Sequence, residues 1–176
     1  EEFNALNLCN LAYGFSALGE KRADMMFKVA GRVRKCLRDM TMQMLSNVAL
    51  SFARLGIRDE IMMHDIARAV AKQKPHGKMK WVDWRTLLLS FAVLDVQSEV
   101  LIDACVSDMS IAELRASSPW NICVLSAACT KLRAGKQLAR LREEVERQVQ
   151  LRGISDAQLR ECDLLDPSTW TKPDTF

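Results

Sequence analysis

Apolar residues recur along this chain with the spacing of helices. In the clearest segment they occupy the i, i+3, i+4, i+7 and i+10 positions, which lie on a single face of an α-helix. These residues are Leu45, Val48, Ala49, Phe52 and Leu55. A second stripe follows a short gap later, at Met62, Ile66 and Val70. No stretch alternates between apolar and polar residues as a half-buried strand would, so the pattern predicts an all-α fold.

This helical pattern is repeated. The segment NVALSFARLGIRDEIMMHDIA, from Asn47 to Ala67, echoes NLAYGFSALGEKRADMMFKVA, from Asn10 to Ala30, which begins 37 residues earlier. A third copy follows after a further 39 residues, and a fainter fourth after another 38. A fixed period in this range is typical of helical solenoids, whose hairpin units bury their apolar faces against their neighbours. We therefore predict an α-solenoid of about four helical hairpins with a period near 38 residues.

The units of this array are expected to divide residues 1–152 at the breaks between stripes. They cover about 4–40, 41–79, 80–117 and 118–152, and residues 153–176 follow as a capping helix and an extended C-terminal tail.

Residues typical of helix ends support these divisions. Gly19 and Gly56 stand just past the first stripe of their units, where a left-handed residue closes a helix at low cost, and Asp95 takes that place in the third unit. Residues expected to begin helices as side-chain caps are Asp83, Ser98, Ser118 with Pro119 behind it, and Ser155 in a capping box with Gln158.

Composition places the chain among globular domains. It has 176 residues, 49% apolar and 27% charged, which is enough to build one core. Its apolar runs are much shorter than the roughly 20 residues of a membrane-spanning helix, so we expect no direct membrane insertion. Six cysteines form no C-x-x-C pair and fall mostly at apolar helical positions, so they are interpreted as reduced core residues inside a cell or organelle.

Catalytic and metal-binding patterns are missing from the sequence. His64 and His76 have no cysteine or carboxylate partner at ligand spacing, and neither a G-x-S-x-G motif nor a glycine-rich phosphate loop occurs. We therefore expect no enzyme activity, no cofactor and no metal site.

Charge is distributed unevenly. The net charge is +3, but residues 1–80 carry 14 Lys and Arg against 8 Asp and Glu, whereas residues 81–176 carry 11 against 14. Five cations follow Met25 without an intervening acid: Lys28, Arg32, Arg34, Lys35 and Arg38. Four more lie in the next interhelical segment: Lys72, Lys74, Lys78 and Lys80. Because like charges at helical spacing repel, these clusters indicate binding of a polyanion through its phosphates. A solvated basic surface is the alternative.

Polar positions on the first helix of each unit are candidates for contacts with bases. Modular RNA-binding repeats read one base with a few side chains at such positions. The candidate base-facing residues are Asn10, Asn47, Ser51, Arg54, Thr86, Ser90 and Lys131. Only the second and third units offer polar groups at two or more of their three positions, so we do not expect recognition of more than two or three bases.

Residues 45–63, LSNVALSFARLGIRDEIMM, carry a resemblance to a known group. The pattern L-S-N-x-A-x-x-F-A-x-L-G followed by R-D-E resembles the organellar helical-repeat proteins, namely octotricopeptide, heptatricopeptide and FASTK-type repeats. The resemblance covers roughly residues 4–110, and residues 150–176 do not resemble the RAP domain in which many of these proteins end. It implies RNA binding in a mitochondrion or, alternatively, a chloroplast, where some members are built into ribosomes.

Together these features predict a non-catalytic RNA-binding protein. We expect a structural subunit of an organellar ribonucleoprotein, such as the mitochondrial ribosome, with rRNA as its ligand. The acidic second half and the C-terminal tail, which contains Trp170 and Phe176, are expected to contact neighbouring proteins. A protein-only scaffold of an organellar membrane complex, in which the basic half meets acidic proteins or lipid headgroups, is the second hypothesis.

Overall fold

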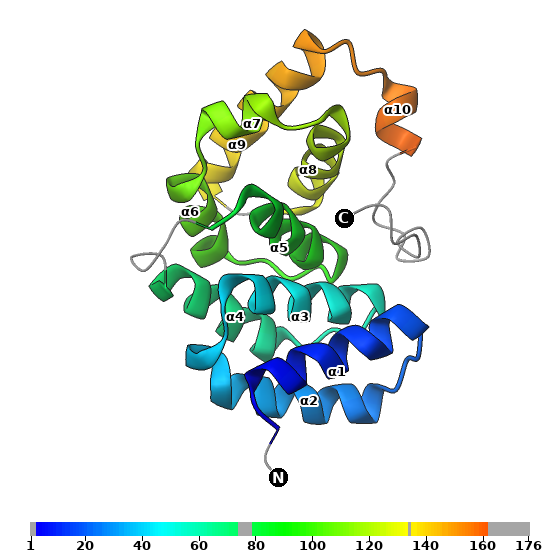
Figure 1. The fold of residues 1–176 in the computed structure, drawn as a ribbon. Helices are drawn as coiled ribbons and strands as arrows, with labels where there is room; N and C mark the ends of the chain where they lie inside the picture. Colours follow the sequence, from blue (N-terminus) through cyan, green and yellow to red (C-terminus); the bar gives the residue numbers. More distant parts are fainter. Residues whose placement is uncertain (1–2, 74–78, 134, 162–176) are drawn as a thin grey trace.

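The chain is all-α, as predicted. The computed structural model describes residues 3–73, 79–133 and 135–161, and no strand occurs within these ranges (Figure 1). The longer helices are α1 (Ala5–Leu18), α2 (Ala23–Cys36), α3 (Met42–Arg54), α4 (Glu60–Gln73), α5 (Trp81–Val93), α6 (Glu99–Asp108), α8 (Pro119–Lys131) and α9 (Gly135–Leu151). The short ones are the 3-10 helix η1 (Leu37–Asp39), α7 (Ile111–Ala116) and α10 (Asp156–Glu161).

The longer helices pack in two rows. In the first row α1 packs on α3, α3 on α5, and α5 on α8. In the second row α2 packs on α4, α4 on α6, and α6 on α9. Each helix of the first row is followed along the chain by a helix of the second. Figure 1 shows the resulting progression from the N-terminal pair α1 and α2 to the C-terminal pair α8 and α9.

The apolar stripes form the core between these rows. Leu45, Val48, Ala49 and Phe52 on α3 have no exposed surface, and Phe91 on α5 is equally buried. On α4 the second stripe, at Met62, Ile66 and Val70, is also fully buried. Burial of such side chains is the main source of stability for a helical domain.

Three helices of the first row end in the same way. Gly19, Gly56 and Asp95 have φ values of 67°, 59° and 51°, which confirms the left-handed residues predicted at these places. After each of them, the next backbone N–H donates to a carbonyl of the last helical turn, from Glu20 to Phe15, Ile57 to Phe52 and Val96 to Phe91. These bonds satisfy carbonyls that the ends of α1, α3 and α5 would otherwise leave unpaired.

Three of the four residues predicted to cap the start of a helix do so. Ser98 and Ser118 accept hydrogen bonds from Leu101 and Asn121 as N-caps, and the capping box of Ser155 and Gln158 is present. The prediction of Asp83 as a cap is wrong. The helix α5 already begins at Trp81, and Asp83 lies buried in its first turn, where its Oδ1 accepts a hydrogen bond from Ser46 Oγ at 3.1 Å.

A short helix that the sequence pattern did not predict follows α6. The helix α6 ends at Asp108, and α7 begins three residues later with Ser110 as its N-cap. Its single buried residue is Leu114.

The cysteines lie where their helical positions predicted. Cys9, Cys105, Cys123 and Cys129 are buried and Cys36 is half-buried, and no disulfide joins these five described cysteines. The sixth, Cys162, lies outside the described residues.

Candidate nucleic-acid interface

The clearest candidate site is the outer surface of α2 with η1. Met26, Val29, Ala30 and Val33 bury one face of α2, so the remaining side chains point away from the core. All five cations singled out in the sequence are exposed: Lys28, Arg32, Arg34, Lys35 and Arg38. We call these five residues the α2 basic surface. Lys28, Arg32 and Lys35 recur every three or four residues and therefore follow one line along the helix for about 10 Å.

The neighbouring helix α4 extends this surface. Arg68 on α4 lies beside Arg34, because both bond to the carboxylate of Asp65, and the exposed Lys72 follows Arg68 one turn later on the same helix. Lys72 was predicted as a phosphate ligand, whereas the sequence analysis missed Arg68. Arg68 is isolated from other cations in the sequence, and only the packing of α2 on α4 brings it near the basic cluster.

The carboxylate of Asp65 links α2 to α4. Asp65 Oδ2 on α4 accepts a hydrogen bond from Arg34 Nε at 2.7 Å, and its other oxygen accepts one from Arg68. Burial alone would raise the pKa of Asp65, but the hydrogen bonds from Arg34 and Arg68 outweigh it and lower the pKa below its usual range. Asp65 is therefore ionised at neutral pH, and the three residues together contribute a net charge of +1.

Of the lysines predicted to bind phosphate just before α5, the structure describes only one. Lys80 is exposed at the N-cap of α5. Lys74 and Lys78 lie outside the described residues, as does His76.

Three of the candidate base-facing residues do not reach the surface. Ser51, Thr86 and Ser90 are 1%, 5% and 0% exposed. Their hydroxyls donate to carbonyls one turn earlier in their own helices, at Asn47, Val82 and Thr86. A ligand cannot contact these hydroxyls in this structure, so we do not include them in the proposed interface. In the sequence they have the same polar character as exposed positions, and only the approach of neighbouring helices buries them.

The other candidate base-facing residues are scattered. Asn10 and Lys131 are exposed at opposite ends of the first row, and Asn47 is half-buried between them. Arg54 is half-buried too, and burial lowers its pKa although a hydrogen bond to Tyr13 on α1 opposes this shift. These residues form no continuous exposed line of the kind that base readout by successive repeats requires.

Charge changes sign along the second row of helices. The helix α6, which packs on α4, contains Glu99, Asp103 and Asp108 but neither Lys nor Arg. Asp108 Oδ2 accepts hydrogen bonds from Trp84 Nε1 at 2.8 Å and from the backbone N–H of Met79 at 3.2 Å, so it also holds α5 to α6. At the C-terminal end of this row α9 balances four cations with three acids, whereas α2 carries four cations against one acid, so the largest excess of positive charge lies on α2.

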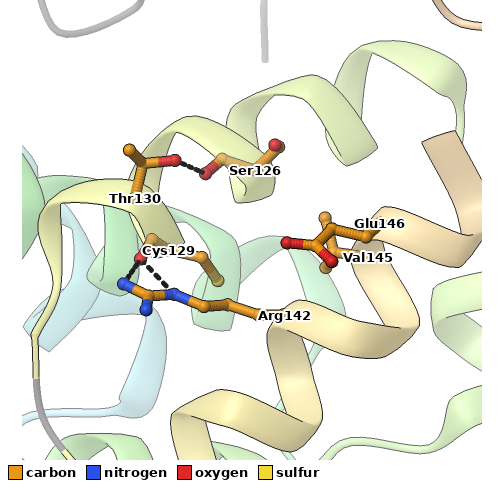
Figure 2. A pocket seen from close by; sticks show the side chains of 6 residues that line it. All are labelled: Ser126, Cys129, Thr130, Arg142, Val145 and Glu146. Carbon is orange, nitrogen blue, oxygen red and sulfur yellow. Dashed lines mark hydrogen bonds between the residues drawn. The ribbon is translucent and has the colours of Figure 1, made fainter.

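A hollow of about 270 Å³ lies between α8 and α9 (Figure 2). It is lined by Ser126, Cys129, Thr130, Arg142, Val145 and Glu146. The Arg142 guanidinium donates from Nε to the carbonyl oxygen of Cys129 at 2.8 Å and from Nη2 to that of Leu132 at 2.6 Å. Burial raises the pKa of the Cys129 thiol to about 12, so the thiol stays protonated at neutral pH and is a poor nucleophile.

Metal-binding and membrane-spanning features are absent from the described residues. They contain no group of three or more His, Cys, Asp or Glu side chains that could hold a metal ion. None of their helices has the length and apolar character needed to cross a membrane. No family model, curated protein or solved structure matches the chain.

Proposed function

We propose that this protein is a non-catalytic RNA-binding α-solenoid that serves as a structural subunit of an organellar ribonucleoprotein. Its ligand is rRNA, as in the mitochondrial ribosome, and its compartment is the mitochondrion or, alternatively, the chloroplast. The organellar assignment rests on the resemblance of residues 45–63 to organellar helical repeats. RNA binding rests on the α2 basic surface.

That surface is the observation that carries the proposal. From Met25 to Arg38 the chain has five cations and no acid, and all five side chains are exposed. Repulsion between like charges at i, i+4 spacing costs a helix a few tenths of a kcal/mol for each pair. The carboxylate of Asp65 pairs with Arg34, but this acid is shared with Arg68 and leaves the surface with a positive charge. A phosphate backbone would supply the negative charge that this segment of the chain lacks.

The order of packing supports the solenoid part of the proposal. Helices of the first row begin at Ala5, Met42, Trp81 and Pro119, close to the period of the sequence repeat. Each packs on the next, and the second-row helices do the same. In solenoids each unit contacts its neighbours in this way, which leaves extended surfaces along the array for ligands.

A second candidate function is a protein-only scaffold. The acidic helix α6 favours it, because α6 offers Glu99 and Asp103 to a basic protein surface without any cation of its own. In this case the α2 basic surface would contact acidic proteins rather than RNA.

Two triple variants with the same change in net charge test RNA binding. The first replaces Lys28, Arg32 and Lys35 with Gln. The control replaces Arg133, Arg140 and Arg147, which are exposed on or near α9, with Gln. We expect the first variant to bind single-stranded RNA more weakly. Its plot of log affinity against log salt should flatten by about 0.7 for each phosphate that is no longer neutralised, whereas the control stays close to the parent.

The measurement is fluorescence anisotropy with a labelled RNA over a series of salt concentrations, after circular dichroism has shown that all three proteins are folded. Equal reductions of affinity in both variants would mean that binding follows net charge and not the α2 basic surface. If the parent does not bind RNA at low salt, the scaffold function replaces the RNA-binding one.

A further inference from the structure

An aromatic side chain lies among the cations of α2. Phe27 is 50% exposed and directly precedes Lys28 of the α2 basic surface. The same position of the next two units is occupied by His64 and Asp103, so the packing of the units does not require an apolar side chain here. Single exposed apolar residues are common on protein surfaces. The residues beside Phe27 therefore decide whether it belongs to a binding site.

Gly31 lies one turn after Phe27 on the same face of α2. Glycine is the least favourable residue in a helix apart from proline. Neither conformation nor packing requires it here, because its φ is not positive and a Cβ at this position would meet no atom of the described residues within 4 Å. The equivalent position on α4 holds Arg68, so a long side chain fits at this point of the repeat. Gly31 thus leaves the surface beside the Phe27 ring uncovered.

This uncovered surface is flanked by positive charge. Phe27, Gly31 and Arg34 follow one another at intervals of four and three residues, so they form a line along α2. The line of three cations described above runs beside it, displaced by one residue. On the other side lies α4, which packs on α2 and bonds to Arg34 through Asp65 (Figure 1). The aromatic ring therefore lies between cations of α2 and the helix that carries Arg68.

Two guanidinium groups meet at the end of the line that Phe27 begins. Arg34 donates to Asp65 from Nε and Arg68 from Nη2, so each keeps further N–H groups for another acceptor. The two arginine side chains are 43% and 56% exposed. Arg34 lies about 10 Å from Phe27 along the helix axis. Because guanidinium groups bind phosphate oxygens through paired N–H groups, this end of the line is suited to a phosphate.

We propose that Phe27, with the open surface over Gly31, stacks on an unpaired base of the RNA, and that Arg34 and Arg68 bind a phosphate of the same strand. This inference rests on the proposed function, because it names the kind of RNA that the α2 basic surface takes: a single strand with exposed bases. Proteins that bind single strands combine cations along the backbone with aromatic side chains on which bases stack. Phe27 and its neighbours supply both groups on one surface.

Stacking on Phe27 depends on the type of strand and not on its sequence. Every base has a flat face, so unpaired bases of any identity can stack on the ring. In duplex RNA the bases are stacked inside the double helix, and recognition relies on phosphates, 2′-hydroxyls and shape. Loss of the ring should therefore weaken the binding of single strands and leave the binding of duplex RNA unchanged.

Phe27→Ala removes the ring without changing the charge. By fluorescence anisotropy, its affinity for a labelled single-stranded RNA should fall at least about 5-fold, the lower end of the range for one stacked base. The slope of log affinity against log salt should stay that of the parent, because no phosphate contact is lost. Its affinity for duplex RNA should also stay that of the parent. The matched control is Phe3→Ala, because Phe3 is 59% exposed but precedes α1, outside the α2 basic surface; it should bind both RNAs like the parent.

Two further variants test the same surface in proteins that keep their fold. Gly31→Leu raises helix propensity, and a leucine four residues after a phenylalanine packs on its ring. This variant should be more stable than the parent and yet bind single-stranded RNA more weakly. Phe27→Trp keeps an aromatic ring and should bind single strands at least as tightly as the parent. RNA should quench its fluorescence more strongly than that of the parent, whose four tryptophans lie elsewhere.

The outcomes separate this inference from the proposed function. If the parent binds single-stranded RNA and Phe27→Ala or Gly31→Leu binds it equally well, the stacking site is overturned and the proposed function stands. Equal weakening of single-stranded and duplex RNA binding by Phe27→Ala also overturns the stacking site, since the ring would then act through the fold or the phosphate contacts. If the parent binds neither RNA at low salt, the proposed function fails and this inference fails with it.

Discussion

Phe52 and Phe91 occupy the same position in successive units, and each is completely buried. In the fourth unit Cys129 stands at this position. Cys129 is also buried, but a hollow of about 270 Å³ lies beside it, between α8 and α9. A benzyl side chain fills far more space than a thiol. Phe52 and Phe91 therefore bury more apolar surface in the core than Cys129 does at the same position.

Replacing Phe52 with Ala should therefore destabilise the protein strongly. We expect the free energy of unfolding to fall by about 3–5 kcal/mol, the usual range for emptying a buried aromatic site. Phe27→Ala is the matched control, because Phe27 on α2 is 50% exposed and should cost much less. Urea denaturation followed by circular dichroism measures both changes. Equal destabilisation of the two variants would contradict the packing assigned to Phe52.

Among single elements, the residues that end helices of the first row were easier to predict from the sequence than the residues that begin them. Gly19, Gly56 and Asp95 could be placed from the sequence because a left-handed residue has few alternatives to Gly, Asn and Asp. The prediction that Asp83 caps the start of a helix was wrong. Its carboxylate could cap a helix, but it lies in the first turn of α5 and bonds to Ser46 on α3, a contact that no local pattern encodes.

Two glycines with similar open surroundings should respond to substitution in opposite directions. A Cβ built on Gly19 or on Gly31 meets no atom within 4 Å, but Gly19 has a φ of 67° and Gly31 is inside α2. Gly19→Ala should cost about 1–2 kcal/mol because of left-handed strain, whereas Gly31→Ala should stabilise by about 0.5–1 kcal/mol through helix propensity. Thermal and urea unfolding of both variants measure the difference. A stabilised Gly19→Ala would show that α1 does not end as described.

For the whole molecule, the spacing of apolar residues predicted the all-α character and the buried stripes of the helices. It did not predict which polar residues reach the surface. Ser51, Thr86 and Ser90 lie on helices flanked by neighbours on both sides, so their exposure depends on how closely α1, α3, α5 and α8 approach one another. The five cations of the α2 basic surface were easier to predict as exposed, because burying five charges without partners would cost far more free energy than a domain can supply.

The arrangement of charge and of polar side chains leads to one expectation about recognition. Phosphate contacts bind RNA without regard to sequence, whereas base contacts distinguish one RNA from another. The described residues offer exposed cations on α2 and α4 but no continuous line of exposed polar groups along the first row. We therefore expect unrelated single-stranded RNAs of equal length to bind with affinities that differ by less than the factor of about 10 that one good base contact supplies.

Competition between unlabelled RNAs of unrelated sequence at one fixed salt concentration measures this preference. The double variant Asn47→Ala with Lys131→Ala removes two of the base-facing candidates that are not fully buried. It should leave the ratio of affinities between RNAs unchanged and lower every affinity slightly, because only one cation is removed. A sequence-reading protein would respond in the opposite way, since the double variant would then remove the preference for one RNA while affecting the others little. In that case the contact surface would lie on the first row of helices, and the α2 basic surface would serve only to attract the RNA.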